Sequence, residues 1–354
     1  MKQIIPLFAR LTKIFNWPRF LLIIVSSPII CAFAYIENSS KECMPWQRPL
    51  WGFFAHKKIN RLAVFTLPPE MFGFYKKNID YITENAINAD QRRYAIKEEA
   101  PRHFIDLDNY ADSAKRQLAK FTWKDAVDKI GEDSLYAHGI VPWHINSMKY
   151  QLTEAFRKKD VKRILSLSTD IGHYIADAHV PLHTTRNYNG QLSNQVGIHG
   201  FWESRLPETF AENYDFFVGQ ATYEEFPQKR AWQTVINANA ALDSVLLFEK
   251  DLSIQFSEDK KFSFEEINGI TTRVYSREFT TKYHQMLKNQ VERQMRASVK
   301  MIGDFWFTCW VDAGQPDLLP LKKYKPNKED EEEEKAEKVN WLRRIFEVRK
   351  EVDN

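Results

Sequence analysis

The chain has 354 residues, of which 44% are hydrophobic and 27% are charged, a balance typical of one large globular domain. Only 12 glycines and almost no alternation of apolar and polar residues exclude a β-sandwich or barrel and predict an all-α fold. The 50 basic and 47 acidic residues nearly balance, and three cysteines are too few for a disulfide scaffold.

The N-terminal segment has the features of an export signal. Four basic residues precede the apolar run FLLIIVSSPIICAFA, which ends on small residues at Ala34. We predict a signal peptide over residues 1–34 and a periplasmic or secreted protein. The alternative is an uncleaved N-terminal membrane anchor, for which about 15 apolar residues are short. Cleavage leaves 46 basic and 47 acidic residues, so the mature chain has no excess positive charge to attract nucleic acid or anionic lipid.

Helical spacing dominates the chain after an irregular lead-in at residues 35–50. Apolar residues recur three and four positions apart over residues 161–171 and again over 287–305. Residues 322–354 lose this pattern and carry an acidic run, which is typical of a charged, mobile tail. We therefore predict a single multi-helix domain over residues 51–321.

A short stretch in the middle of the chain holds four of the nine histidines. His173 and Asp177 are four residues apart, so on a helix both side chains leave the same face. A proline then ends the helix before His183, and His199 and Glu203 repeat the spacing of four. Imidazole and carboxylate are zinc ligands, and five of them exceed what one tetrahedral ion can use. The pattern therefore predicts a metal cluster with further ligands elsewhere in the chain.

Candidates for those ligands are His56, Asp90 and His103. With them, the motif His-x3-Asp-x5-His followed by His-x3-Glu resembles the zinc-dependent phospholipase C and single-strand-specific nuclease superfamily, from Trp51 to about Leu319. The resemblance implies an all-helical fold with a cluster of three zinc ions between the helices.

The resemblance also assigns the ligands. They are Asp90, His103, His173 and Asp177 for the first ion, His183, His199 and Glu203 for the second, and His56, Asp177 and the main-chain amino and carbonyl groups of Trp51 for the third. The third set departs from the family pattern, because cleavage after Ala34 would leave sixteen residues before Trp51 and no free amine there. We therefore predict two zinc ions, and a third that depends on where the mature chain begins.

Four residues are candidates for catalysis or substrate binding. By resemblance, Asp90 also orients or deprotonates the attacking water, and Arg93 contacts the phosphate through its guanidinium group; a surface arginine is the alternative for Arg93. Phe104 and Asp106 match residues with which the nucleases stack and read a base, although a core aromatic and a capping acid have the same pattern. Glu203 in place of aspartate resembles the phospholipases.

The expected function is zinc-dependent hydrolysis of phosphodiester bonds, of the phospholipase C type. The alternative within the superfamily is a single-strand-specific nuclease or nucleotidase, so the expected partner is a phospholipid or single-stranded nucleic acid, with no stable protein partner. A hypothesis of another class is a zinc-stabilised binding module without turnover. A structural zinc site is closed by four protein ligands, whereas the predicted second site has three, which favours catalysis.

Overall fold

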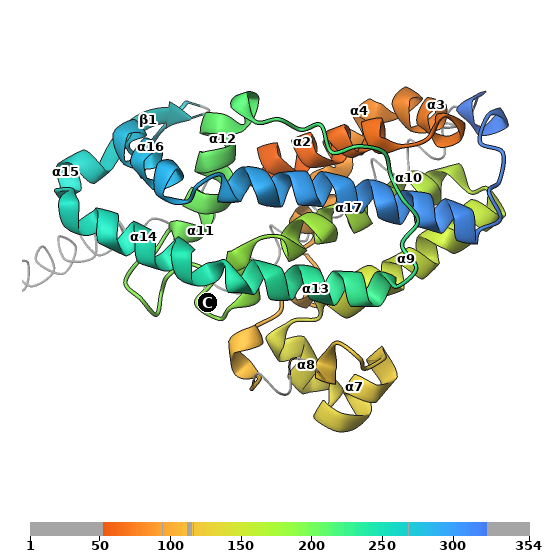
Figure 1. The fold of residues 1–354 in the computed structure, drawn as a ribbon, viewed down its shortest axis with the longest axis horizontal. Helices are drawn as coiled ribbons and strands as arrows, with labels where there is room; N and C mark the ends of the chain where they lie inside the picture. Colours follow the sequence, from red (N-terminus) through yellow and green to blue (C-terminus); the bar gives the residue numbers. More distant parts are fainter. Residues whose placement is uncertain (1–51, 94, 112–114, 116, 268, 324–354) are drawn as a thin grey trace, which may run out of the picture. The chain divides into compact units, whose positions relative to one another are not determined.

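The computed structural model describes residues 52–93, 95–111, 115, 117–267 and 269–323, which are mostly helical and include a single two-stranded sheet (Figure 1). The predicted all-α class is therefore confirmed. The predicted signal peptide, the lead-in, Trp51, Cys43 and the tail beyond Lys323 lie outside the described residues. No helix within the described part of the chain is long and apolar enough to cross a membrane.

The elements keep the labels of Figure 1. The α-helices are α2 (Phe53–Ala63), α3 (Pro69–Lys77), α4 (Ile79–Glu84), α5 (Asn88–Arg92), α7 (Trp123–Ile130), α8 (Glu132–His138), α9 (Val141–Lys158), α10 (Val161–Ala178), α11 (Ile198–Gly200), α12 (Leu206–Phe210), α13 (Pro227–Ala240), α14 (Leu242–Gln255), α15 (Glu258–Lys261), α16 (Arg277–Met286) and α17 (Gln290–Asp312). Short 3-10 helices are η2 (Val64–Thr66), η3 (Asn85–Ile87), η4 (Ala100–His103), η5 (Leu107–Asn109), η6 (Pro181–Thr184), η8 (Ala211–Asn213) and η9 (Pro320–Lys323). A π-helix, η7 (Phe201–Arg205), and the strands β1 (Phe262–Ile267) and β2 (Ile270–Tyr275) complete the set.

Helix α10 is the central element of the fold. It begins where the side chain of Asp160 accepts a hydrogen bond from the backbone N–H of Arg163 (3.1 Å). The helix packs against α2, α9, α17 and η3, and residues 171–178 are buried on every face. Two polar residues of this segment, His173 and Asp177, therefore lie inside the bundle rather than on its surface.

The packing around α10 is aromatic. Trp306 of α17 donates its indole N–H to the carbonyl oxygen of Ser168 on α10 (3.1 Å). The ring of Tyr75 stacks on Trp306 at 4.8 Å between centroids, and its hydroxyl bonds Ser168 Oγ (2.8 Å). These contacts fix α17 and α3 against the helix that carries the polar pair.

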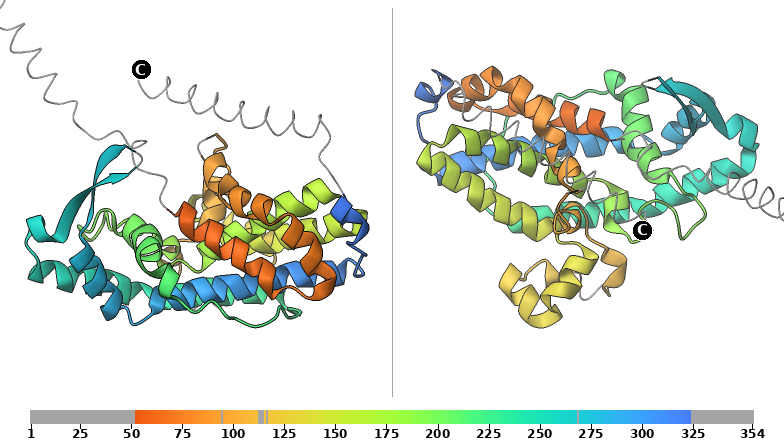
Figure 2. Two further views of the ribbon diagram at one scale, coloured as in Figure 1. Left: turned by 90° about the horizontal axis from the view of Figure 1, so that it is seen from above. Right: turned by 180° about the vertical axis from the view of Figure 1, so that it is seen from behind.

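The small sheet supports the π-helix η7. Strands β1 and β2 are antiparallel, with Phe262 opposite Tyr275, and they lie near α12 and α16 (Figures 1 and 2). Phe201 of η7 stacks on Tyr275 at 3.8 Å between centroids. Arg205, at the end of η7, makes a bidentate ion pair with Glu265 of β1 (2.8 and 2.6 Å). Both strands of the hairpin therefore contact η7.

Candidate metal centre

Helices α2 and α10 bring three of the predicted ligands together. His173 and Asp177 leave α10 one turn apart, as their spacing predicts. His56 comes from α2, and its ring stacks on that of His173 at 4.0 Å between centroids. This approach requires Gly172, because a Cβ atom there would overlap Asn60 Oδ1 on α2. The close contact of the two helices thus places α2 within reach of the α10 ligands.

His199 and Glu203 lie where the helix widens into the π-helix η7. Their side chains meet at 2.7 Å between Nε2 and Oε2. Such π-helical turns are rare and occur frequently at functional sites. Gly52, just before α2, has φ +99°, and a Cβ atom there would lie 3.2 Å from Glu203 Oε1. The start of the described chain therefore lies against the Glu203 carboxylate.

The first group of ligand atoms, group 1, consists of Asp90 Oδ1, His103 Nδ1, His173 Nε2 and Asp177 Oδ2. His103 Nδ1 lies 2.8 Å from Asp177 Oδ2 and 3.1 Å from His173 Nε2. Asp90 Oδ1 lies 3.8 Å from His103 Nδ1 and 3.7 Å from His173 Nε2. A tetrahedral zinc ion with bonds of about 2.0–2.2 Å separates its ligand atoms by roughly 3.3–3.6 Å. The distances among His103, His173 and Asp177, and those from Asp90 to the two histidines, bracket that value.

Group 2 consists of His183 Nε2, His199 Nε2 and Glu203 Oε2. The two imidazole nitrogens are 3.1 Å apart, and His183 Nε2 lies 3.5 Å from Glu203 Oε2. All three residues were predicted to share one ion, and their ligand atoms lie close enough to do so.

Group 3 forms between the first two. It consists of His56 Nε2, Asp177 Oδ1 and Glu203 Oε1, with the nitrogen 3.4 Å from the aspartate oxygen and 3.3 Å from the glutamate oxygen. Asp177 thus uses one oxygen in group 1 and the other in group 3, as the resemblance implies. Glu203 likewise serves groups 2 and 3, which the sequence did not indicate.

Backbone carbonyl groups fix which nitrogen each ring presents. His173 Nδ1 lies 2.8 Å from the carbonyl oxygen of Ala86, and His183 Nδ1 lies 2.7 Å from that of His103. His199 Nδ1 lies 3.2 Å from the carbonyl oxygen of Tyr188. Each Nδ1–H donates to its carbonyl group, which leaves the Nε2 lone pair facing the cluster.

The charges in the centre favour a bound cation. Asp177 and Glu203 are buried, and all their ion-pair partners among the described residues are histidines. Burial lowers the pKa of His56, but the hydrogen bonds that its ring donates to the carboxylates of Asp177 and Glu203 outweigh burial and leave that pKa well above its usual value. Burial also lowers the pKa of His183, yet the charge of Asp177 brings it to about 9. The buried carboxylates are therefore stabilised by positive charge, which metal ions can supply in place of protons on the histidines.

Glu99 is a buried carboxylate behind group 1. It accepts hydrogen bonds from Arg102 Nη1 (2.7 Å), Arg92 Nη2 (3.3 Å) and the Tyr174 hydroxyl. Its Oε1 lies 3.8 Å from His103 Nε2, a buried nitrogen with no hydrogen-bond partner among the described residues. Carboxylates in this position orient metal-binding histidines. Sequence reasoning missed Glu99, although its position four residues before His103 was an available signal.

Asp90 and Arg93 lie at the accessible side of group 1. The side chain of Asp90 is 19% exposed, against 1% for Asp177. Arg93 is 41% exposed, and its Nη1 lies 3.7 Å from Asp90 Oδ1. Its neighbour Arg92 turns inward and pairs with Asp170 (3.1 Å), whereas Arg93 keeps its guanidinium group partly exposed beside Asp90.

Phe104 and Asp106 are both half-buried and flank a contact between two ligand segments. The backbone N–H of Ile105 donates to the carbonyl oxygen of His183 (2.9 Å), which places both residues beside groups 1 and 2. Burial first, and then the charge of Asp108, raises the pKa of Asp106 to about 6. Asp106 accepts no capping hydrogen bond at η5, so the capping alternative is not what the structure shows.

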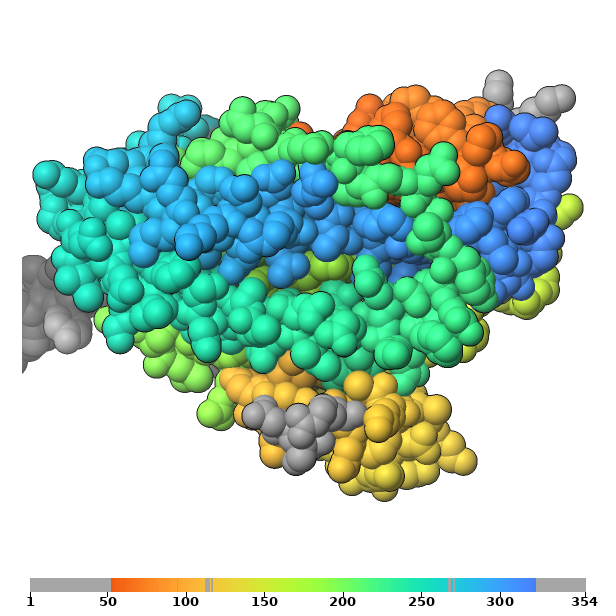
Figure 3. Space-filling view, viewed as in Figure 1, coloured from red at the N-terminus to blue at the C-terminus, as the bar shows by residue number. Residues whose placement is uncertain are grey.

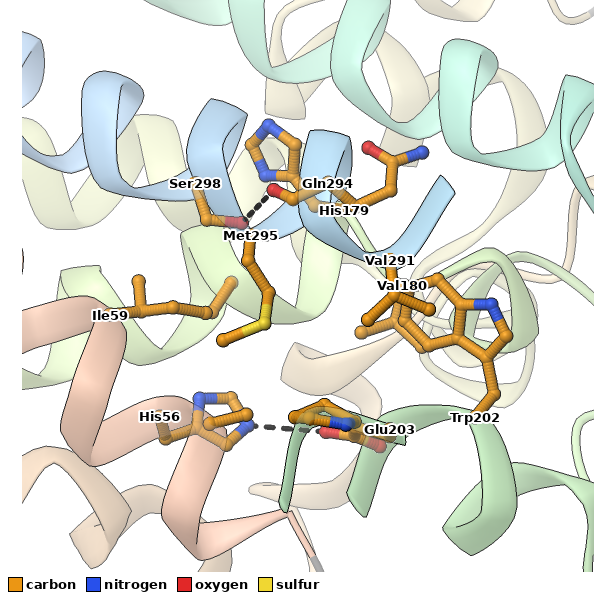
Figure 4. Close-up of a pocket in the computed structure, with 13 residues that line it drawn as sticks. His56, Ile59, His179, Val180, Trp202, Glu203, Val291, Gln294, Met295 and Ser298 are labelled. Carbon is orange, nitrogen blue, oxygen red and sulfur yellow. Dashed lines mark hydrogen bonds and ion pairs between the residues drawn. The ribbon is translucent and has the colours of Figure 1, made fainter. Parts of the chain in front are cut away.

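A cavity of about 20 Å³, enough for about one water molecule, lies behind group 3. His56 and Glu203 form one wall of it, with Met295 and Ile59 opposite (Figure 4). His179 also lines the cavity. It belongs to none of the ligand groups, and its Nδ1 bonds the carbonyl oxygen of Ile175 (2.8 Å).

No protein-family model matches the chain, and no curated protein sequence matches it. Membership of the phospholipase C and nuclease superfamily therefore stays a prediction. The function is inferred below from the side chains of the metal centre themselves.

Proposed function

We propose that this protein is a zinc-dependent hydrolase of phosphodiester bonds. The observation that carries the proposal is the sharing of Asp177 and Glu203 between neighbouring groups of ligand atoms. Shared carboxylates hold ions close together, and closely spaced ions suit an anionic phosphodiester because both the entering and the leaving oxygen need stabilisation.

Zinc fits the donor set better than magnesium or calcium. The centre combines five imidazoles with three carboxylates, whereas the two hard cations prefer oxygen ligands alone. Asp90, His103, His173 and Asp177 would hold one ion, and His183, His199 and Glu203 a second; His56 with Asp177 and Glu203 would hold a third. Bound zinc supplies positive charge to phosphate oxygens and acidifies water toward a pKa of about 7.

The chain's own groups then have distinct tasks. Asp90 is the group 1 carboxylate nearest to solvent and is placed to orient water or accept its proton. Arg93 offers an exposed guanidinium group beside it, which suits a phosphate oxygen. Among the described residues, group 2 has three side-chain ligands rather than four, which would leave one position of a bound ion for water or substrate. This open position favours a catalytic centre over a zinc-stabilised binding module.

We propose a phospholipid as the substrate, in line with Glu203 and its resemblance to the phospholipases. A single-stranded nucleic acid is the second candidate, favoured by Phe104 and Asp106. Both lie beside the metal ligands, and a carboxyl group with a pKa of about 6 can accept or donate a hydrogen bond near neutral pH. Asp106→Asn separates the two, because it should weaken cleavage of DNA or RNA and leave that of phosphatidylcholine unchanged.

The proposal is tested by metal content and turnover of the same sample. Purified protein should hold at least two zinc ions by elemental analysis and hydrolyse bis-p-nitrophenyl phosphate, and chelation should abolish the hydrolysis. Side-by-side assays on phosphatidylcholine and on single-stranded DNA and RNA then identify the substrate. One zinc ion or none, in protein never exposed to chelator, would contradict the proposal, and zinc without any turnover would favour the binding module.

A further inference from the structure

The loop at residues 186–197, between η6 and α11, exposes several apolar side chains. Three of its apolar side chains face solvent: Tyr188 is 53% exposed, Leu192 65% and Val196 61%. Single exposed apolar residues are ordinary on a protein surface, but three in one short loop concentrate apolar surface in one segment.

Several polar side chains of this loop bond the loop's own backbone. Asn187 Oδ1 accepts from the backbone N–H of Leu192 (2.8 Å), and Asn189 Oδ1 accepts from that of Gly197 (3.1 Å). Gln191 Nε2 donates to the carbonyl oxygen of Arg186 (2.6 Å). These hydrogen bonds brace the backbone of the loop, which lowers the entropic cost of presenting its apolar side chains to a partner.

The loop contacts the metal ligand His199 at one end and helix α14 at the other. The Tyr188 carbonyl group orients His199, and the ring of Tyr188 stands edge-on to that of His199 at 6.1 Å between centroids. At the other end, Gln195 Nε2 donates to the carbonyl oxygen of Leu246 on α14 (2.8 Å), next to Leu247, which is 52% exposed. The loop lies beside α14 at the surface (Figures 1 and 3).

The chemistry of the loop fits a lipid surface better than a nucleic acid. Binding to single strands uses stacked aromatic rings along a basic groove. Arg186 is the one charged residue in the 186–197 sequence, and Leu192 and Val196 are aliphatic. Aliphatic side chains partition into the acyl boundary of a bilayer, while tyrosine prefers the level of the headgroups.

We propose that the 186–197 loop docks the protein on a phospholipid surface, with Leu192 and Val196 entering the apolar layer and group 2 facing the headgroup phosphates. This docking rests on the proposed function, since it presents the phosphodiester of a membrane lipid to the metal centre. The loop would thus select a substrate held in a membrane surface, a preference that the metal ligands alone do not specify.

The test compares the full chain with Leu192→Ser/Val196→Ser in sedimentation with phosphatidylcholine vesicles. The double variant should bind at least tenfold more weakly, which corresponds to about 1.4 kcal/mol. The matched control is Tyr150→Ser/Phe217→Ser, which removes two exposed apolar side chains from other elements and should bind as the wild type does. All three proteins share one N-terminus, so any contribution of its apolar run is common to them.

Hydrogen exchange supplies a local measurement. Vesicles should slow exchange of the amides at 186–197 in the wild-type chain, and an N-terminal anchor would not have that effect. Equal vesicle binding by the wild type and the double variant, or unchanged exchange in the loop, overturns the docking. The docking is also overturned if the wild type forms a dimer, or binds nucleic acid, and the double variant does not. The loop would then bind a second copy of the chain or a nucleic acid.

Turnover of bis-p-nitrophenyl phosphate separates this proposal from the proposed function. Soluble substrate needs no docking, so the double variant should hydrolyse it at the wild-type rate. Turnover without loop-dependent vesicle binding refutes the docking alone, and vesicle binding without any turnover refutes the proposed function.

Discussion

At the scale of single residues, two carboxylates connect the metal centre. Asp177 lies within 3.8 Å of four histidines, and Glu203 within 3.5 Å of three. Asp177 is also the more deeply buried of the two, with 1% of its side chain exposed against 11%. Neutralising Asp177 therefore removes the counter-charge of four imidazoles, and neutralising Glu203 that of three.

We expect Asp177→Asn to lose more zinc and more activity than Glu203→Gln. The loss for Asp177→Asn should exceed the roughly 10–100-fold typical of residues that only orient a ligand, because two groups lose an oxygen ligand. Elemental analysis and turnover measure both effects. Wild-type zinc content in Asp177→Asn would show that Asp177 does not bridge.

Glu99→Gln should weaken zinc binding about 10–100-fold, because the amide keeps the shape but loses the charge that faces His103 Nε2. Competition with a chelator of known affinity measures this directly. Asp170→Asn is the matched control, since Asp170 shares the partner Arg92 but does not pair with His103. Equal losses in the two variants would mean that the network acts on the fold and not on the ligand.

At the scale of elements, the contact between α2 and α10 decides whether group 3 forms. Gly172→Ala should destabilise the protein by about 1–3 kcal/mol, because the new methyl group meets Asn60 Oδ1 and pushes α2 away. Urea denaturation measures the stability, and zinc titration measures the effect on His56. Asn60→Ala in the same chain removes the obstructing oxygen and should restore part of the stability and part of the zinc binding. If it restores neither quantity, the contact between the helices is not the cause.

At the scale of the whole molecule, metal binding and folding are coupled. The carboxylates and histidines of the three groups come from α2, α5, η4, α10, η6 and the α11–η7 segment, so bound ions would join elements distant in sequence. Ions bound about 1,000-fold above their dissociation constant add about 4 kcal/mol each to the free energy of unfolding. Chelation should therefore lower the melting temperature by on the order of 10 °C. An unchanged melting temperature in metal-free protein would contradict a centre that holds these elements together.

The mature N-terminus should determine the third zinc ion. An α-amino group at Trp51 could complete group 3, whereas a peptide nitrogen cannot, because its lone pair is delocalised into the carbonyl group. We expect either a chain that begins at Trp51 with three zinc ions, or one that begins near Tyr35 with two strongly bound ions and a weak third. N-terminal sequencing and zinc stoichiometry on one sample test the pairing. A chain beginning near Tyr35 with three equally tight ions would show that the amine is dispensable and that Glu203 Oε1 supplies the missing ligand.

Much of the candidate site was predictable because its ligands are local in sequence. His173 with Asp177, and His199 with Glu203, follow from a spacing of four on a helix, and the structure brings each pair together. Glu99 was not predicted, because an acid four residues before a histidine is common on helices. The shared use of Glu203 was not predictable either, since it depends on α2 lying against η7.

By itself, the sequence determined the helical class and the residue types that can hold zinc, because periodicity and donor chemistry are properties of short segments. Only the tertiary structure decided which carboxylate oxygen faces which histidine, which ring nitrogen each backbone carbonyl group leaves free, and which side chains of the 186–197 loop face solvent. Those features depend on contacts between segments far apart in the chain, and the close packing of α2, α10 and η7 sets them.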